Sequence, residues 1–315
     1  MQTRALGRTG LAVSEVGFGG WAIGGDAHGN SYGPTDDAVS KAAVARALEL
    51  GCTFFDTADV YGHGHSEELL GEVIGNRDGV VIATKGGGAY MYGDRRWGQV
   101  NFSPEYIRFA VEQSLKRLRR DCIDLYQLHN PSLELIVDGR VFDALEELKQ
   151  EGVIRAYGVS IHRPEEGIAA IREGRPQAIQ VVYNLFSQGP DERLFPMAKQ
   201  AGVAIIAREP LANGFLTGVH TASDSFPDGD IRHEWPAQAK AARARAASAL
   251  RFLEAGGQRT LAQAALRFCL DSDAVAVVIP GAKTAAQAEE NLRAADVPPL
   301  TEAERAQADK LLFGR

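Results

Sequence analysis

Four side chains of different chemistry stand at positions from which they could act together in proton transfer. Asp56 ends a short apolar run, and Tyr61 lies in the glycine-containing turn behind it. Lys85 and His129 each follow a further apolar run. A free phenol has a pKa of about 10, and an adjacent ammonium favours the ionised form and lowers that value. We therefore expect Lys85, held charged by Asp56, to make Tyr61 a usable proton donor. A neutral His129 imidazole can hydrogen-bond a carbonyl oxygen and orient it.

The element that carries the acid and the phenol is residues 51–75, GCTFFDTADVYGHGHSEELLGEVIG. The β-prone apolar residues 53–55 predict a buried strand that opens into a polar loop. Ser66 starts SEEL, which predicts a serine N-cap with acids in the first turn of a helix. Asp56 and Tyr61 should then project from the carboxyl end of a strand, where α/β folds place ligands.

The alternation of strand and helix repeats along the chain. Counting the units gives eight, which predicts an α/β fold of the (β/α)8 TIM-barrel type; an open, doubly wound sheet is the alternative. The expected strands are residues 15–19, 53–55, 80–84, 123–128, 154–160, 178–183, 204–207 and 275–280. The expected helices include residues 36–50, a helix after Ser103-Pro104, and residues 137–151, 165–173 and 191–201.

Other segments add to this repeat. Residues 4–19 predict a small N-terminal β-hairpin that turns at residues 7–10, followed by the first barrel strand at residues 15–19. Extra helices are expected at residues 237–254 and 301–312. Insertions at residues 86–102, which carry Arg95, Arg96 and Trp97, and at residues 211–235 follow strands, so we expect substrate and cofactor loops there. Since no linker divides the chain, we expect residues 1–315 to form a single domain.

Composition narrows the class of protein. The net charge of −7 over 315 residues argues against a nucleic-acid partner, which would call for a basic face. No apolar run is long enough to span a bilayer and the N-terminus lacks a secretion signal, so we expect a cytoplasmic protein without a membrane partner. Cys52, Cys122 and Cys269 lie far apart in apolar runs and are expected to be reduced core thiols. We also expect a monomer, because a closed barrel has no open sheet edge.

Three motifs together resemble the aldo-keto reductase family over nearly the whole chain. They are FFDTADVYGHGHSEELLG at residues 54–71, ATK at residues 83–85 and DLYQLHNP at residues 124–131. The resemblance implies that Asp56, Tyr61, Lys85 and His129 form the family's catalytic tetrad. It also implies hydride transfer between a nicotinamide cofactor and an aldehyde or ketone, or the corresponding alcohol, with Tyr61 exchanging the proton and with no metal.

The resemblance extends to the nicotinamide site. Ser160 in GVS and Gln180 in AIQVVYN occupy positions that hold the nicotinamide carboxamide in the family. Ile161 stands where many members have Asn. Arg208 stands where many members have an aromatic residue stacked on the nicotinamide, a role that a planar guanidinium can also fill. Trp21 matches an apolar wall of the substrate pocket.

The final motif, VVIPGAKTAAQAEEN at residues 277–291, resembles the family's dinucleotide-binding loop and helix. Helix-start amides near Thr284, together with Lys283, would suit a 2′-phosphate. Gly281 and Gln287 replace the Lys and Arg of strongly NADP-selective members, so NADPH is favoured and NADH is the alternative. The implied cofactor-binding residues are Gly20, Trp21, Asp56, Ser160, Gln180, Arg208, Pro210, Leu211, Gly281, Lys283, Thr284, Gln287, and Glu290 and Asn291 on the adenine.

Two other enzyme interpretations compete with this one. Gly17, Gly19 and Ala22 have the spacing of a Rossmann phosphate loop, but that loop must open a helix at once, and glycines follow instead. His63 and His65, with the histidines farther along, could outline a metal-dependent hydrolase on a barrel. The last strand, however, ends in Pro-Gly rather than a carboxylate, and the final motif would be unexplained.

A third interpretation is a partner-binding subunit that keeps the reductase scaffold and senses the redox state of the cofactor. The intact tetrad speaks against lost catalysis.

Overall fold

The computed structural model describes residues 1–28, 31–88 and 100–314. Arg95, Arg96 and Trp97, which we considered as substrate contacts, lie outside these ranges. No helix within the described ranges has both the length and the apolar character that crossing a membrane requires.

Eight parallel strands form the centre of the molecule in the order in which they occur in the sequence. The sheet closes on itself: the Gly17 amide donates to the Val278 carbonyl (2.8 Å), and the Gly19 amide donates to the Pro280 carbonyl (2.9 Å). The predicted (β/α)8 barrel is therefore confirmed. The strands are β3 (Phe18–Gly19), β4 (Phe54–Asp56), β5 (Val81–Gly86), β6 (Ile123–His129), β7 (Ile154–Ser160), β8 (Ala178–Val182), β9 (Ala204–Arg208) and β10 (Val275–Val278).

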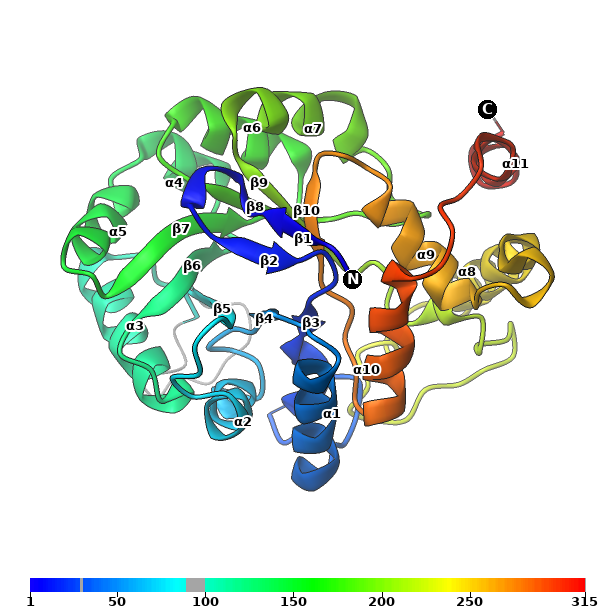
Figure 1. The fold of residues 1–315 in the computed structure, drawn as a ribbon, viewed down its shortest axis with the longest axis horizontal. Helices are drawn as coiled ribbons and strands as arrows, with labels where there is room; N and C mark the ends of the chain where they lie inside the picture. The colour runs from blue at the N-terminus through cyan, green and yellow to red at the C-terminus, as the bar shows by residue number, and fades with distance from the viewer. Residues whose placement is uncertain (29–30, 89–99, 315) are drawn as a thin grey trace.

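Helices surround the strands, as Figure 1 shows. Two expected helices differ in extent. The helix expected at residues 137–151 is two helices, because Gly139 takes a left-handed φ of 73° between them. The helix expected at residues 237–254 ends earlier, and a 3-10 helix follows. The helices are α1 (Asp37–Glu49), α2 (His65–Val73), α3 (Pro104–Leu118), α4 (Leu133–Asp138), α5 (Val141–Gln150), α6 (Pro164–Glu173), α7 (Pro190–Ala201), α8 (Ala237–Ala249), α9 (Leu261–Leu270), α10 (Ala285–Leu292) and α11 (Glu302–Phe313).

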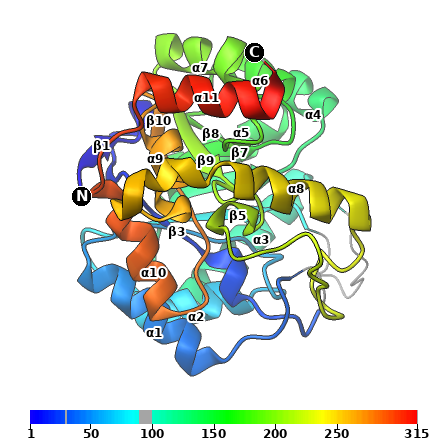
Figure 2. The ribbon, with the colours of Figure 1, turned by 90° about the vertical axis from the view of Figure 1, so that its right-hand side faces the viewer.

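The extra segments lie outside the ring of strands. The predicted hairpin consists of β1 (Thr3–Ala5) and β2 (Ala12–Ser14), paired antiparallel, and it crosses the amino-terminal end of the barrel (Figure 1). Leu6 and Val13 of this hairpin pack with the barrel interior, so the hairpin closes that end. Helices α8 and α11 lie together on one side of the molecule (Figure 2).

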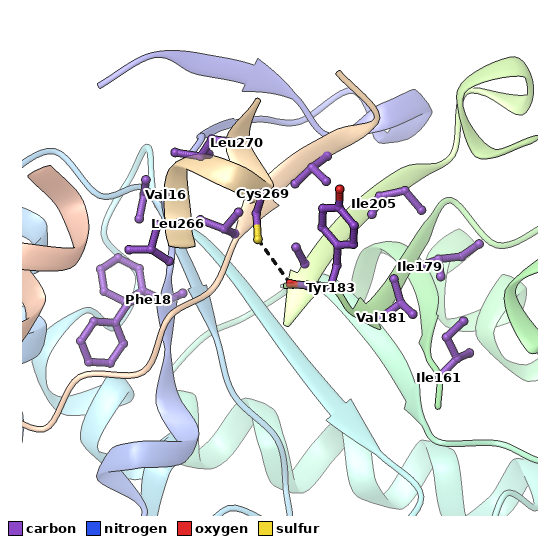
Figure 3. Packing of buried hydrophobic residues seen from close by; sticks show 14 of the residues in the cluster. Val16, Phe18, Ile161, Ile179, Val181, Tyr183, Ile205, Leu266, Cys269 and Leu270 are labelled. Carbon is purple, nitrogen blue, oxygen red and sulfur yellow. Dashed lines mark hydrogen bonds between the residues drawn. The ribbon is translucent and has the colours of Figure 1, made fainter. Parts of the chain in front are cut away.

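The larger apolar core lies between the strands and the helices. Figure 3 shows Ile179, Val181 and Ile205 of the strands in this layer with Leu266 of α9. The Cys269 thiol, also in α9, points at the Tyr183 carbonyl at 3.3 Å. In the described part of the chain all three cysteines are free thiols; two are buried, and Cys122 is half-buried rather than in the core.

The N-cap predicted at Ser66 is wrong. Helix α2 begins at His65, and its N-cap is Gly64, whose φ of 94° a side chain would not tolerate. Ser66 is fully buried in the first turn, where its hydroxyl accepts a hydrogen bond from Thr57 Oγ1 and donates to the Gly20 carbonyl, both at 2.8 Å. This serine therefore joins α2 to the loops that follow β3 and β4.

Candidate active site

The register of the barrel brings the candidate polar side chains to one end. Lys85 of β5 lies opposite Gln127 of β6, and His129 lies opposite Ser160 of β7. Ser160 in turn lies opposite Gln180 of β8. A cavity of about 890 Å³ opens at this carboxyl end of the strands.

A buried ion pair lies beside the phenol, and Asp56 of the pair and Tyr61 both line the cavity. Lys85 Nζ donates to Asp56 Oδ1 at 2.5 Å, to the Thr57 carbonyl at 2.8 Å and to Tyr61 Oη at 3.1 Å. The Lys85 side chain is fully buried, and that of Asp56 is 3% exposed. The ammonium thus has three oxygen partners, one of which is the phenol that the sequence predicts as the proton donor.

The pKa of Tyr61 is raised, whereas the sequence predicts that it is lowered. Burial raises the pKa of the phenol, and the neighbouring Lys85 ammonium lowers it without overcoming that rise. Asp56, on the far side of the ammonium, adds to the increase. Tyr61 is therefore protonated at neutral pH, as a proton donor must be. The pull of Lys85 favours the phenolate once the proton leaves.

His129 faces Tyr61 edge-on, with ring centroids 5.8 Å apart and planes at 84°. Burial holds the pKa of His129 well below its usual range, and the positive charges of Lys85 and Arg208 act in the same direction. The imidazole is therefore neutral at physiological pH and keeps one N–H, which is the state expected for a group that hydrogen-bonds a carbonyl oxygen.

Gln127 is a site residue that our sequence analysis missed. Its Nε2 donates to Asp56 Oδ2 at 3.3 Å, and Gln180 Nε2 donates to the same oxygen at 2.7 Å. The sequence did contain an indication of this role. Every second residue of β6 points into the barrel, and Leu125, Gln127 and His129 share that face. A glutamine between a core leucine and a candidate catalytic histidine is out of place in an apolar strand.

Most of the candidate catalytic and cofactor residues line the cavity. Gly20, Lys85, Ser160 and Thr284 are not among its lining residues in the described part of the chain. Lys85 lies behind Tyr61, and the Gly20 carbonyl is used by Ser66. The candidates that do line it are Trp21, Asp56, Tyr61, His129, Gln180, Arg208, Pro210, Leu211, Gly281, Lys283, Gln287, Glu290 and Asn291.

The side-chain oxygen of Gln180 is buried and has no hydrogen-bond donor among the described residues. Its Nε2 is occupied by Asp56 and Gln127, whereas its Oε1 is buried and accepts no hydrogen bond from any described residue. An unpaired buried carbonyl oxygen costs about 1–3 kcal/mol. Because Gln180 lines the cavity, an amide N–H of a bound molecule could remove that cost. The nicotinamide carboxamide has such an N–H, so the site fits this cofactor.

Arg208 is held in place beside this position. Its Nη2 donates to the Ile161 carbonyl at 3.1 Å, and its Nη1 pairs with the Glu209 carboxylate. Ile161 thus contributes its main-chain oxygen to holding this guanidinium. A planar guanidinium fixed on two sides is suited to stacking on a flat ring.

The far end of the cavity is the start of α10. Thr284 is the N-cap, its hydroxyl accepting from the Gln287 amide at 3.2 Å. Gln287 Oε1 accepts from the Lys283 amide at 2.8 Å, and Asn291 Nδ2 donates to the Gly281 carbonyl at 3.1 Å. The Lys283 ammonium does not point freely toward an anion: it donates to the Tyr32 carbonyl at 2.6 Å.

Tyr32 belongs to a second set of residues that the sequence did not reveal. Asn213 Nδ2 donates to Tyr32 Oη at 2.9 Å, and the Arg232 guanidinium lies 4.9 Å from the Tyr32 ring. The Ile231 amide donates to the Ser31 carbonyl at 2.8 Å. The loop after β3 and the loop after β9 are thereby joined along one side of the cavity.

The competing interpretations lack support in the structure. His65 Nε2 lies 2.9 Å from Asp37, and the His63 ring stacks on His28 with centroids 4.2 Å apart. Within residues 1–28, 31–88 and 100–314, no three potential ligands gather as a metal site requires. After Gly19 the chain makes a 3-10 turn, Gly20–Ile23, and not the helix that a Rossmann loop opens.

Comparison with known proteins agrees with this geometry. The model of the Aldo/keto reductase family matches residues 15–312. The uncharacterized oxidoreductase YqkF of Bacillus subtilis is 35% identical over 96% of this chain and 94% of its own. The aldo-keto reductase yakc [NADP(+)] of Schizosaccharomyces pombe is 34% identical over 74% and 68% of the two chains. The structure of aldo-keto reductase AKR11C1 from Bacillus halodurans, holo form, matches with a TM-score of 0.81 and 34% identity, over 99% of this chain and 96% of that one.

Proposed function

The chain belongs to the aldo/keto reductase family, and on that premise we propose that it transfers a hydride between NADPH and an aldehyde or ketone, or the corresponding alcohol. The observation that carries the proposal is the contact of Lys85 Nζ with both Asp56 and Tyr61, which line a cavity that extends to α10. The contact supplies a proton donor, and the cavity supplies room for a dinucleotide beside a small substrate.

Each side chain has a defined task in this proposal. The bound nicotinamide supplies or takes up the hydride. Tyr61 Oη gives its proton to the carbonyl oxygen of the substrate, and Lys85 stabilises the phenolate that remains. The neutral His129 imidazole donates its N–H to the same substrate oxygen and orients it. In alcohol oxidation the same groups act in reverse, with Tyr61 as the base.

The cofactor is held by the residues along the cavity. Gln180 Oε1 would accept from the carboxamide, with Ser160 beside it, and the Arg208 guanidinium would stack on the ring. Near α10 the helix-start amides around Thr284, with Lys283, would hold a 2′-phosphate, and Glu290 and Asn291 would hold the adenine. The remaining candidate cofactor residues are Trp21, Pro210, Leu211, Gly281 and Gln287, which line the cavity, and Gly20, which does not.

The preference for NADPH rests on Lys283 at the start of α10. Its ammonium has to turn from the Tyr32 carbonyl to meet a 2′-phosphate. The name of the relative yakc [NADP(+)] points the same way. Gly281 and Gln287 supply no charge, so NADH remains the alternative cofactor. We further propose a cytoplasmic monomer of one domain, residues 1–315, with only a small molecule as partner. A redox-sensing subunit is not needed to explain a complete tetrad.

The test is a fluorescence titration of the purified protein with NADPH and with NADH, followed by turnover with a panel of aldehydes and ketones. We expect Tyr61→Phe to lose at least about 100-fold in kcat while binding the cofactor normally, because general-acid catalysis is worth about that much. Tyr157→Phe is the control, since Tyr157 is a buried phenol that donates to Glu146 on the outside of the barrel. Absence of nicotinamide binding, or near-native turnover by folded Tyr61→Phe, would refute the proposal.

A further inference from the structure

Asp56 divides its two oxygens between different kinds of donor. Oδ1 accepts from the Lys85 ammonium, and Oδ2 accepts from the amides of Gln127 and Gln180. All three donor side chains are buried, and they satisfy both carboxylate oxygens without a hydrogen bond from water. Because a buried carboxylate is stable only when it is fully hydrogen-bonded, the amides on Oδ2 decide how Asp56 is oriented toward Lys85.

The two amides are themselves joined across a strand. Gln127 lies on β6 and Gln180 on β8, with β7 between them. The residue of β7 that pairs with Gln127 is Gly158. Because glycine has no side chain, nothing projects from this position of β7 into the barrel between the two glutamines. Gln180 Nε2 can therefore reach Gln127 Oε1, at 3.3 Å. A Cβ at position 158 would lie 2.2 Å from the Ala178 carbonyl oxygen. The backbone therefore requires glycine here, and the space between the two glutamines stays open.

This contact fixes which end of the Gln180 amide faces the cofactor. Nε2 has two hydrogens, and they are used by Asp56 Oδ2 and Gln127 Oε1. If the amide were turned around, its carbonyl oxygen would face two other acceptors, which is repulsive. Oε1 is therefore held on the opposite side, where it accepts from no described residue. Gln127 thus acts in two directions, on the carboxylate of the tetrad and on the candidate carboxamide acceptor.

We propose that Gln127 is a positioning residue that sets both the orientation of Asp56 toward the Lys85–Tyr61 pair and the orientation of Gln180 toward the nicotinamide carboxamide. The inference rests on the proposed function for the meaning of the second orientation. Gln127 contacts neither the substrate nor the reacting atoms in this arrangement, and its effect passes through its two neighbours.

Two variants separate the two effects. Gln127→Leu removes both the donor and the acceptor at nearly the same volume. Gln127→Glu keeps an oxygen that Gln180 can donate to, but it cannot donate to Asp56 when ionised. The matched control is Gln177→Leu, because Gln177 is a buried glutamine just before β8 whose amide contacts Lys149 and Arg8 at the opposite end of the barrel.

The first readout is the titration of Tyr61 by NMR with ring-labelled tyrosine, assigned with Tyr61→Phe; it needs neither turnover nor cofactor. The charged and titratable groups that face Tyr61 are Lys85, Asp56, Arg208 and His129. Loss of Gln127, one of the two donors to Oδ2, leaves the negative charge of Asp56 less shielded. We therefore expect the Tyr61 titration to move to higher pH in both Gln127 variants and to stay unchanged in Gln177→Leu.

The second readout is cofactor affinity and rate. We expect Gln127→Leu to weaken NADPH binding and to lower kcat by about tenfold or more, and Gln127→Glu to lower kcat with less effect on binding. A folded Gln127→Leu protein whose Tyr61 titration and NADPH affinity both match wild type would overturn the inference. A lower melting temperature of Gln127→Leu, with the Tyr61 titration and the NADPH affinity unchanged, would overturn it as well. Failure of wild type to bind or reduce anything would instead count against the proposed function, and the tyrosine titration would still decide the role of Gln127.

Discussion

At the scale of single residues, the Lys85–Asp56 pair is the feature on which the site depends. Both side chains are buried, and a pair of this kind costs desolvation energy that only good geometry and further hydrogen bonds return. The Thr57 carbonyl, the Tyr61 phenol and the two glutamine amides provide those further bonds. The arrangement is better explained by a need for a fixed charge beside Tyr61 than by stability, because an apolar pair of similar size would be no less stable.

Removing one charge should therefore separate stability from rate. We expect Lys85→Met to lower the free energy of unfolding by about 3–5 kcal/mol, since it leaves Asp56 buried and unpaired. The double variant Lys85→Met with Asp56→Asn should regain much of that stability but no activity. Urea unfolding and kcat measured on the same preparations give the comparison. As a control, Lys41→Met breaks the exposed pair with Glu72 and should cost less than about 1 kcal/mol. Equal losses in the single and double variants would contradict this account.

At the scale of elements, two serines show what local sequence can and cannot predict. Ser103 precedes Pro104, and it is the N-cap of α3 as expected, accepting from the Tyr106 amide at 3.3 Å. Ser66 stands in an equally good capping pattern, SEEL, yet it lies inside α2. The difference is the glycine-rich turn before it, which starts the helix two residues early and turns the serine inward. The choice depends on tertiary contacts with Thr57 and Gly20, which no local pattern contains.

Ser66→Ala and Ser103→Ala should therefore have different effects on stability and on cofactor binding. Ser103→Ala removes an ordinary cap and should cost about 1 kcal/mol without altering kinetics. Ser66→Ala leaves the buried Gly20 carbonyl and the Thr57 hydroxyl without a partner, and we expect a loss of about 1–3 kcal/mol. It should also raise the KM for the cofactor, because Gly20 directly precedes Trp21 in the cavity wall. Chemical denaturation and steady-state kinetics test both variants; an unchanged KM in Ser66→Ala would show that this bond serves stability alone.

At the scale of the whole molecule, the repeat of strand and helix was predictable because each unit is set by local periodicity. That Asp56, Tyr61, Lys85 and His129 lie together was predictable because they stand at or just after strand ends, which a barrel gathers at one mouth. The contacts between distant loops were not. Tyr32 meets Asn213 and Arg232, nearly two hundred residues later in the chain, through side chains in stretches without periodicity. The partner of the Lys283 ammonium lies 251 residues earlier, so sequence could suggest its charge but not the carbonyl that holds it.

Lys283 therefore connects the two ends of the chain at the cavity, and its substitution tests whether it also selects the cofactor. If the ammonium turns to a 2′-phosphate, Lys283→Met should weaken NADPH binding by about 1.5–3 kcal/mol, the usual value of a charged hydrogen bond, or roughly ten- to hundredfold. NADH lacks the phosphate, so its affinity should change little. Lys240→Met is the control, because Lys240 likewise donates to a main-chain carbonyl, that of His233, but outside the cavity. Fluorescence titration with both cofactors gives the two affinities. Equal weakening for NADPH and NADH would mean that Lys283 acts by holding the Tyr32 loop and does not contact the phosphate.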